Sequence, residues 1–217
     1  MALEKDNGPY IAVCPVNHTG DRHSPSAWKM TNAMPSWSWT GCEGQKASIE
    51  VYARAARVEL WLNGRIIGRK ALKNDCFAKF SVTYEPGKLE AVSYDARGCE
   101  LGRCNLTTAG QQTQITAGPE QSSVQAGHLC YIRLRYTDEK GITKPLARGN
   151  IKVEVDGGTL VGLGNACPYH ECSYLDCVAD TYYGEALAIV RAGEGNSLTL
   201  AADDGMHSTA VTVPVTR

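Results

Sequence analysis

Apolar and polar side chains alternate along many short stretches of this chain, and turn residues separate the stretches. In one of them Ile49 and Val51 point to one side, while Glu50 and Tyr52 point to the other. A period of two residues is typical of a β-strand with one buried face. No stretch shows the 3.6-residue period of an amphipathic helix, so the pattern predicts an all-β fold. The other alternating stretches are residues 58–62, 76–84, 89–94, 132–136, 151–155, 183–192, 197–202 and 208–215.

The turns between these stretches carry their own signals. Asn63-Gly64 follows an alternating run and predicts a tight hairpin, because both central positions of a type I′ turn need a positive φ. Residues 65–70 are then expected to form the returning strand. Asp138-Glu139-Lys140-Gly141 predicts another turn after the run that ends at Tyr136.

A polar stretch rich in Thr, Gln and Gly, residues 107–120, divides the chain into two series of predicted strands. Each half of the chain has about 100 residues, the usual size of an immunoglobulin-like sandwich. We therefore expect two tandem immunoglobulin-like β-sandwich domains, residues 46–113 and 114–217. Residues 1–45 fit neither pattern and are expected to form a leading arm that packs on the first sandwich. Both halves lack the Cys–Trp–Cys core of true immunoglobulin domains.

The composition of the chain excludes some classes of partner. The 217 residues carry 22 basic and 23 acidic side chains, a formal net charge of −1, which argues against a nucleic-acid partner. No run of about 18 apolar residues occurs, so no membrane partner is expected. Nothing suggests a cofactor. The nine cysteines are odd in number and mostly scattered, which favours reduced thiols and a cytoplasmic setting. A periplasmic or secreted setting stays open, because we expect the chain to be a fragment.

The first half of the chain resembles the first β-sandwich after the catalytic barrel in bacterial glycoside hydrolases of family 2, the β-galactosidase type. The segments that carry this resemblance are Pro35-Ser36-Trp37-Ser38-Trp39, Val58-Glu59-Leu60-Trp61-Leu62-Asn63-Gly64 with Gly68, Tyr84-Glu85-Pro86-Gly87-Lys88-Leu89-Glu90-Ala91 and Thr108-Ala109-Gly110. The earlier segments Pro9-Tyr10-Ile11 and Pro15-Val16-Asn17-His18 resemble the segment that leads out of that barrel.

The second half is similar to the immunoglobulin-like domain that follows in the same enzymes. The matching segments are Tyr136-Thr137-Asp138 with Gly141, Gly162-Leu163-Gly164-Asn165 and Tyr182-Tyr183-Gly184-Glu185-Ala186-Leu187-Ala188-Ile189-Val190-Arg191. The order and spacing of these segments are more specific than any one of them. The resemblance covers nearly the whole chain and implies the C-terminal accessory region of such an enzyme.

The same resemblance bears on catalysis. Glycoside hydrolysis uses a pair of carboxylates across one sugar, and in this family the acid/base and nucleophile glutamates lie in the barrel. No segment of this chain matches those motifs, so no catalytic residue is assigned and the chain alone is expected to be inactive. The parent enzyme is expected to hydrolyse a terminal β-linked sugar with retention, as a β-galactosidase. Its barrel and N-terminal domains are the expected partners, and oligomer contacts are open.

The four tryptophans, Trp28, Trp37, Trp39 and Trp61, allow two interpretations. An aromatic ring can stack on the C–H face of a pyranose, so they could bind carbohydrate, together with Tyr169. Alternatively, the tryptophans fasten the sandwich to the barrel, and large apolar patches generally mark contact sites. The contact interpretation is favoured. It predicts partial exposure of Trp28, Trp37 and Trp39 when the barrel is absent.

Cys167, His170, Cys172 and Cys177 lie within eleven residues and could supply four zinc ligands. However, the Cys-x₄-Cys-x₄-Cys spacing differs from the paired Cys-x₂-Cys of structural zinc sites. A long loop with reduced cysteines, or with one disulfide, is therefore favoured over a metal site.

Two rival functions remain. The chain could be a carbohydrate-binding module that holds polymeric substrate, or it could carry immunoglobulin-like repeats of a bacterial surface protein. The second rival usually has several repeats of one kind, whereas the two halves of this chain differ in sequence.

Overall fold

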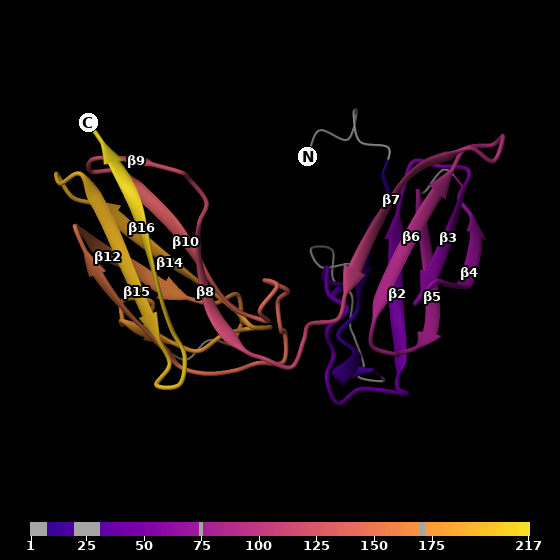
Figure 1. The fold of residues 1–217 in the computed structure, drawn as a ribbon, viewed down its shortest axis with the longest axis horizontal. Coiled ribbons are helices and arrows are strands. Elements are labelled where there is room, and N and C mark those ends of the chain that lie inside the picture. Colours follow the sequence, from indigo (N-terminus) through magenta and orange to yellow (C-terminus); the bar gives the residue numbers. More distant parts are fainter. Residues whose placement is uncertain (1–7, 20–30, 74–75, 170–171) are drawn as a thin grey trace. The chain divides into compact units, whose positions relative to one another are not determined.

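A computed structural model describes residues 8–19, 31–73, 76–169 and 172–217, and the chain divides into two compact units, Met1–Thr108 and Ala109–Arg217 (Figure 1). The prediction of an all-β fold is confirmed. The described residues contain β-strands, one 3₁₀ turn at Val16–His18 (η1) and no α-helix. None of these residues forms a helix with the length and apolar character needed to cross a bilayer.

Unit 1 is a sandwich of two antiparallel sheets. Its strands are β1 (Tyr10–Val13), β2 (Lys46–Tyr52), β3 (Arg57–Leu62), β4 (Arg65–Ala71), β5 (Phe77–Thr83), β6 (Lys88–Tyr94) and β7 (Glu100–Thr107). One sheet has the order β1-β2-β5 and the other has the order β4-β3-β6-β7. The alternating pattern sets the inward faces, because Ile49 and Val51 on β2 and Leu60 on β3 are fully buried.

Unit 2 is a second sandwich. Its strands are β8 (Gln114–Pro119), β9 (Val124–Gln125), β10 (Leu129–Thr137), β11 (Ile151–Asp156), β12 (Gly158–Gly164), β13 (Val178–Ala179), β14 (Glu185–Ala192), β15 (Ser197–Asp203) and β16 (Ser208–Thr216). The sheets have the orders β12-β14-β10-β8 and β13-β11-β15-β16-β9, and among the described strand pairs only β9–β16 is parallel. The core contains aliphatic side chains, Cys130 and Tyr136.

The two turns predicted from the sequence form as expected. Asn63 and Gly64 have φ values of 51° and 78° and connect β3 to β4. The Asp138 turn is closed by the Gly141 amide, which donates to the Asp138 carbonyl at 3.0 Å. One expectation differs: strand β8 occupies residues 114–119 of the polar stretch that we expected to separate the two series of strands. Strand β8 pairs with β10 through backbone hydrogen bonds. A polar sequence can make these bonds as well as an apolar one, because they do not involve the side chains.

Glu50 also differs from the simple alternation. It lies on the side of β2 that was expected to be exposed, yet only 4% of its surface is exposed. Its carboxylate accepts hydrogen bonds from the Tyr52 hydroxyl at 2.7 Å and the Thr31 hydroxyl at 3.1 Å. These partners allow a charged group to be buried. Burial, together with the bond to Glu50 and the charge of Glu50, raises the pKa of Tyr52 to about 12.

Candidate functional site

Trp37 and Trp39 lie inside unit 1 and hold its N-terminal segment in place. Both are fully buried. The Trp37 indole N–H donates to the Glu85 carbonyl at 3.0 Å, and its ring packs edge-on against Tyr84 with ring centroids 4.8 Å apart. The Tyr84 hydroxyl accepts from the Trp39 backbone N–H at 3.0 Å and donates to the Trp37 carbonyl at 3.3 Å. These tryptophans therefore stabilise the unit that contains them.

The expected partial exposure of Trp37 and Trp39 is wrong. Both rings are buried within unit 1, so neither ring presents a face to a sugar or to another domain. Sequence alternation could not show this, because both residues lie in a segment without regular strand structure. Trp28, the third tryptophan of the leading arm, lies outside the described residues.

Among the three tryptophans that the structure describes, only Trp61 reaches the surface. It lies on β3 opposite Glu90 of β6 and Ile66 of β4, and its side chain is half-buried. Within the described part of the chain its indole N–H is buried and has no hydrogen-bond partner. Since Ile66 is 37% exposed, the two residues form a small apolar area among charged side chains. This area remains a candidate for contact with carbohydrate or with another domain.

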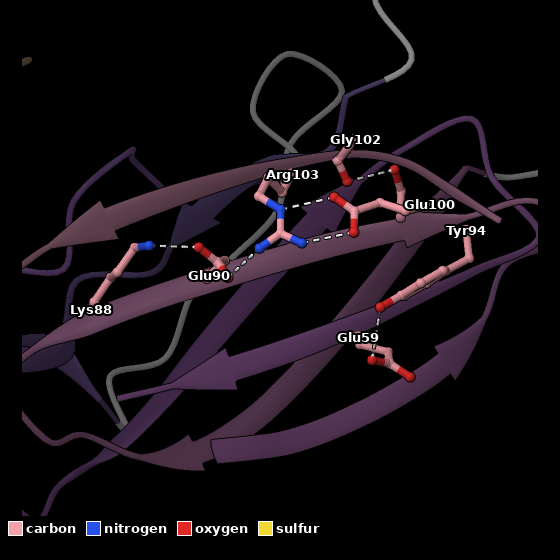
Figure 2. A network of polar contacts seen from close by, with 8 residues as sticks. Glu59, Lys88, Glu90, Tyr94, Glu100, Gly102 and Arg103 are labelled. Atoms are coloured by element: carbon pink, nitrogen blue, oxygen red, sulfur yellow. Dashed lines mark hydrogen bonds and ion pairs between the residues drawn. The ribbon is translucent and has the colours of Figure 1, made fainter. Parts of the chain in front are cut away.

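The charged side chains around Trp61 form a chain of ion pairs on the β3–β6–β7 face, which Figure 2 shows. Arg103 donates twice to Glu100, at 2.8 and 2.7 Å, and once to Glu90 at 3.2 Å. Lys88 binds the other oxygen of Glu90 at 2.7 Å. The paired bond from Arg103 lowers the pKa of Glu100 and raises that of Arg103. These pairs link β6 to β7.

Glu59 is the buried member of the same face, with 8% of its surface exposed. It accepts from the Tyr94 hydroxyl at 3.2 Å, as Figure 2 shows. It also accepts from Arg69 Nε at 2.9 Å. The Arg57 guanidinium covers the Tyr94 ring at 4.4 Å. Burial, and then the bond to Glu59, raises the pKa of Tyr94. Each carboxylate on this face has a cationic partner, so the arrangement joins strands and does not resemble an acid paired with a base.

Unit 2 contains a second, half-buried polar cluster at the turn between β15 and β16. The Asp204 carboxylate accepts from the Tyr136 hydroxyl at 2.7 Å, from the Met206 and His207 amides at 2.9 and 2.7 Å, and contacts the His207 ring at 3.1 Å. Burial acts to raise the pKa of Asp204, but these hydrogen bonds outweigh it and hold the pKa well below its usual range.

Asp138 is more deeply buried, at 1% exposure, and its carboxylate accepts from the Gly110, Lys140 and Ile142 amides at 2.7 to 2.9 Å. Burial acts to raise its pKa, and the three amides together lower it. A glycosidase general acid needs a raised pKa. The pKa shifts at Asp138, Asp204 and Glu100 run in the opposite direction, so none of the three resembles a general acid.

The cysteine-rich segment forms a surface loop between β12 and β13. Tyr169 is 86% exposed, Cys172 and Cys177 are exposed, and Cys167 is half-buried. His170 lies outside the described residues. The described residues contain no group of three or more His, Cys, Asp or Glu side chains placed to hold a metal ion. All nine cysteines are free thiols in this structure.

Sequence reasoning missed the polar partners that explain these sites. Glu59 and Tyr94 are 35 residues apart, and Tyr136 and Asp204 are 68 apart. No local pattern connects such pairs. Tyr183 was also missed as a turn residue: its φ of 50° lies in the left-handed region, and a tyrosine gives no signal for it.

Two protein families match the chain. Residues 44–102 match a domain of unknown function, DUF4982, and residues 114–212 match the glycoside hydrolase family 2 C-terminal domain 5. A protein of Formosa agariphila named "Putative beta-glucuronidase" is 33% identical over 90 residues, which is 40% of this chain and 9% of that protein.

Solved structures match more of the chain. A glycosyl hydrolase family 2 member from Bacteroides cellulosilyticus is 29% identical, with a TM-score of 0.81, and the match covers 94% of this chain and 28% of that one. A β-glycosidase from Bacteroides vulgatus, at 22% identity and a TM-score of 0.76, shares the fold over 98% of this chain and 25% of its own.

The chain thus matches less than a third of the length of these relatives. The resemblance to family 2 accessory domains, which the sequence segments suggested, is confirmed. Residues 114–212 of this chain are a C-terminal accessory domain of the glycoside hydrolase family 2 type.

Proposed function

We propose that this chain is the non-catalytic C-terminal region of a family 2 β-glycosidase and that its role is architectural. The match of residues 114–212 to a C-terminal domain of that family carries the proposal. A likeness to a family 2 glycosyl hydrolase over 94% of the chain supports it for both units. The catalytic barrel of the same enzyme is then the principal partner.

The side-chain chemistry of both units agrees with this role. Glu59, Glu90 and Glu100 are engaged by arginine or lysine, and Asp138 and Asp204 by backbone amides or by Tyr136. A retaining glycosidase needs two carboxyl groups about 5–5.5 Å apart, with one of them protonated at working pH. None of these five groups is free for that task. Catalysis is therefore assigned to the barrel.

The first test is activity of the 217-residue chain by itself. Purified chain should release no aryl group from aryl β-galactoside, β-glucuronide, β-glucoside or β-mannoside. Turnover that co-purifies with the chain and saturates with substrate would overturn the non-catalytic role. The coding DNA upstream of Met1 gives the companion test. A continuous reading frame that encodes a barrel with two catalytic glutamates is expected, and a stop codon directly before Met1 would overturn the proposal.

The next question is which sugar the longer enzyme would release. The sequence segments resemble β-galactosidase-type enzymes, whereas the Formosa agariphila relative has a β-glucuronidase name. We propose a terminal β-linked sugar as the substrate of the longer enzyme, with galactoside and glucuronide as the two candidates. A kcat/KM for one aryl β-glycoside at least tenfold above that for the other decides between them.

A carbohydrate-binding role is the second candidate, and the exposure of Tyr169 favours it. This ring is 86% exposed on the loop of unit 2, and Trp61 is half-buried on unit 1. A glycan array with the intact chain, Tyr169→Ala and Trp61→Ala tests it, with Tyr10→Ala as the control at another exposed ring. Binding that Tyr169→Ala or Trp61→Ala abolishes, with folding unchanged, supports this candidate.

A further inference from the structure

Cys172 and Cys177 lie on the two sides of one β-turn. The Asp176 amide donates to the Ser173 carbonyl at 3.2 Å, which closes a turn over residues 173–176, and the Leu175 amide donates to the Ser173 hydroxyl at 3.1 Å. A β-turn brings the Cα atoms of its first and last residues within about 7 Å. The cysteines immediately before and after it are therefore drawn together, and a disulfide needs Cα atoms about 4.4–6.8 Å apart.

Both cysteines also line the same hollow of the surface. Cys172 and Cys177 line one shallow hollow of about 430 Å³ together with Asn150, Asp176 and Asp180, and both cysteines are exposed. Cys167 precedes the pair by five residues, is half-buried and does not line this hollow. A small molecule can therefore reach Cys172 and Cys177 from one hollow.

The turn is tied to both sheets of unit 2. The Leu163 amide of β12 donates to the Tyr174 carbonyl at 2.8 Å, and the Val153 amide of β11 donates to the Cys177 carbonyl at 2.8 Å. Strands β12 and β11 belong to different sheets. The Tyr174 ring lies against Gly164, where an added Cβ would come within 2.3 Å of it. A cross-link between residues 172 and 177 would thus fix a loop that bridges the sandwich.

Three other thiols are less suited to such chemistry. Burial raises the pKa of Cys42, Cys130 and, to about 11, Cys104, which keeps these thiols protonated. The thiolate is the nucleophile in disulfide exchange, so such groups react slowly. Cys99 is exposed, in the turn between β6 and β7 of unit 1. It provides a control for simple accessibility.

We propose that Cys172 and Cys177 form a reversible modification site that takes a small-molecule disulfide such as glutathione disulfide. One thiolate attacks the reagent, forms a mixed disulfide and releases the first thiol. The second thiolate attacks the protein sulfur of that mixed disulfide and releases the second thiol. The two cysteines lose two protons and two electrons, and the reagent is reduced to two thiols. The product is a disulfide that closes the turn. This chemistry does not depend on the proposed function.

The test is peptide mass mapping after incubation with glutathione disulfide and alkylation of the remaining thiols. The intact chain should gain one internal disulfide, seen as the loss of two hydrogens, between Cys172 and Cys177. Cys172→Ser and Cys177→Ser should instead accumulate the mixed disulfide at the remaining thiol. Cys167→Ser and Cys99→Ser should form the internal disulfide as the intact chain does. A second incubation, with reduced glutathione in place of the disulfide, should restore both thiols.

Two results would overturn the proposal. One is stable mixed disulfides on both cysteines of the intact chain with no internal bond. The other is an internal bond that survives Cys172→Ser because it joins Cys167 to Cys177.

A measurement of thermal stability supplies a separate readout. All four tryptophans lie in residues 1–108, so their fluorescence follows unit 1. Oxidation should raise the melting temperature of unit 2, which is measured by hydrogen exchange. It should leave the melting temperature of unit 1, which is measured by tryptophan fluorescence, unchanged.

Discussion

Each sandwich buries one tyrosine whose hydroxyl holds distant segments together, but the partners differ in charge. In unit 1 the Tyr84 hydroxyl contacts the backbone of Trp37 and Trp39, which is neutral. In unit 2 the Tyr136 hydroxyl donates to the Asp204 carboxylate at 2.7 Å. Burial raises the pKa of both tyrosines, and the Asp204 charge adds to the effect at Tyr136. The buried tyrosine hydroxyl thus has neutral partners in unit 1 and a charged partner in unit 2. Of these two arrangements, only the one in unit 2 is expected to depend on pH.

The largest effect should come from the aromatic cluster of unit 1. Trp37→Ala removes a fully buried ring and its contact with Tyr84. It should lower the free energy of unfolding of unit 1 by about 3–5 kcal/mol, as for other large-to-small core changes. Urea denaturation followed by the fluorescence of the remaining tryptophans measures it. Hydrogen exchange in β10 and β14 should stay as in the intact chain. Equal loss of protection there would show that the two units do not unfold separately.

A smaller loss is expected in unit 2 from Asp204→Ala. The change leaves the Tyr136 hydroxyl and the Met206 and His207 amides without their acceptor. An unsatisfied buried polar group costs about 1–3 kcal/mol, and a loss of that size should appear in hydrogen exchange of β10 and β16. Asp203→Ala is the matched control, because Asp203 is exposed and its carboxylate accepts from the Gly205 amide in an exposed turn. An equal effect of the two changes would contradict the role of this polar cluster.

The charge at Asp204 predicts a pH dependence. Its pKa in the folded chain lies below the unfolded value of about 3.9. The ionised carboxylate therefore stabilises the fold above that unfolded value, and the contribution is lost as pH falls toward the folded pKa. Unfolding of the intact chain and Asp204→Asn, compared from pH 7 to pH 2, should show a stability difference that is full at pH 5 and shrinks below about pH 4. A constant difference over this range would contradict the assignment.

The smallest effect concerns two turns with the same backbone shape. Asn63-Gly64 and Tyr183-Gly184 have φ pairs of 51° and 78°, and of 50° and 75°. Asn suits the first position and Tyr does not. Tyr183→Asn should relieve strain but lose the edge-on contact with Tyr182, whose ring centroid lies 4.6 Å away. We expect a net gain of less than about 1 kcal/mol in unit 2, because the strain of about 1–3 kcal/mol is partly offset by the lost contact.

Tyr182→Leu supplies the comparison for that prediction. It removes the same ring contact but leaves the turn residue unchanged, so it should destabilise unit 2 in urea denaturation followed by circular dichroism. If Tyr183→Asn also destabilises by a similar amount, the aromatic contact outweighs the strain, and the tyrosine is held in the turn by packing.

The same two turns show how far local sequence signals extend. Asn63-Gly64 predicted its hairpin correctly, because the turn needs a positive φ and these residues adopt it at low cost. Tyr183-Gly184 makes the same turn without that signal. There Gly184 lies against the Lys144 carbonyl, and an added Cβ at Gly184 would come within 2.5 Å of it. Packing with a segment 40 residues away imposes the conformation.

The sequence by itself determined the all-β class and the inward face of most strands, because a period of two residues fixes which side chains share a face. It also determined the likeness to family 2 accessory domains, through the order of short segments. The tertiary structure decided which polar and aromatic groups are buried. Trp37 and Trp39 were interpreted as contact residues and are core residues, while Glu50, Glu59 and Asp138 are buried acids. The reason is physical: a buried polar group needs a partner, and those partners come from segments that only the folded chain brings together.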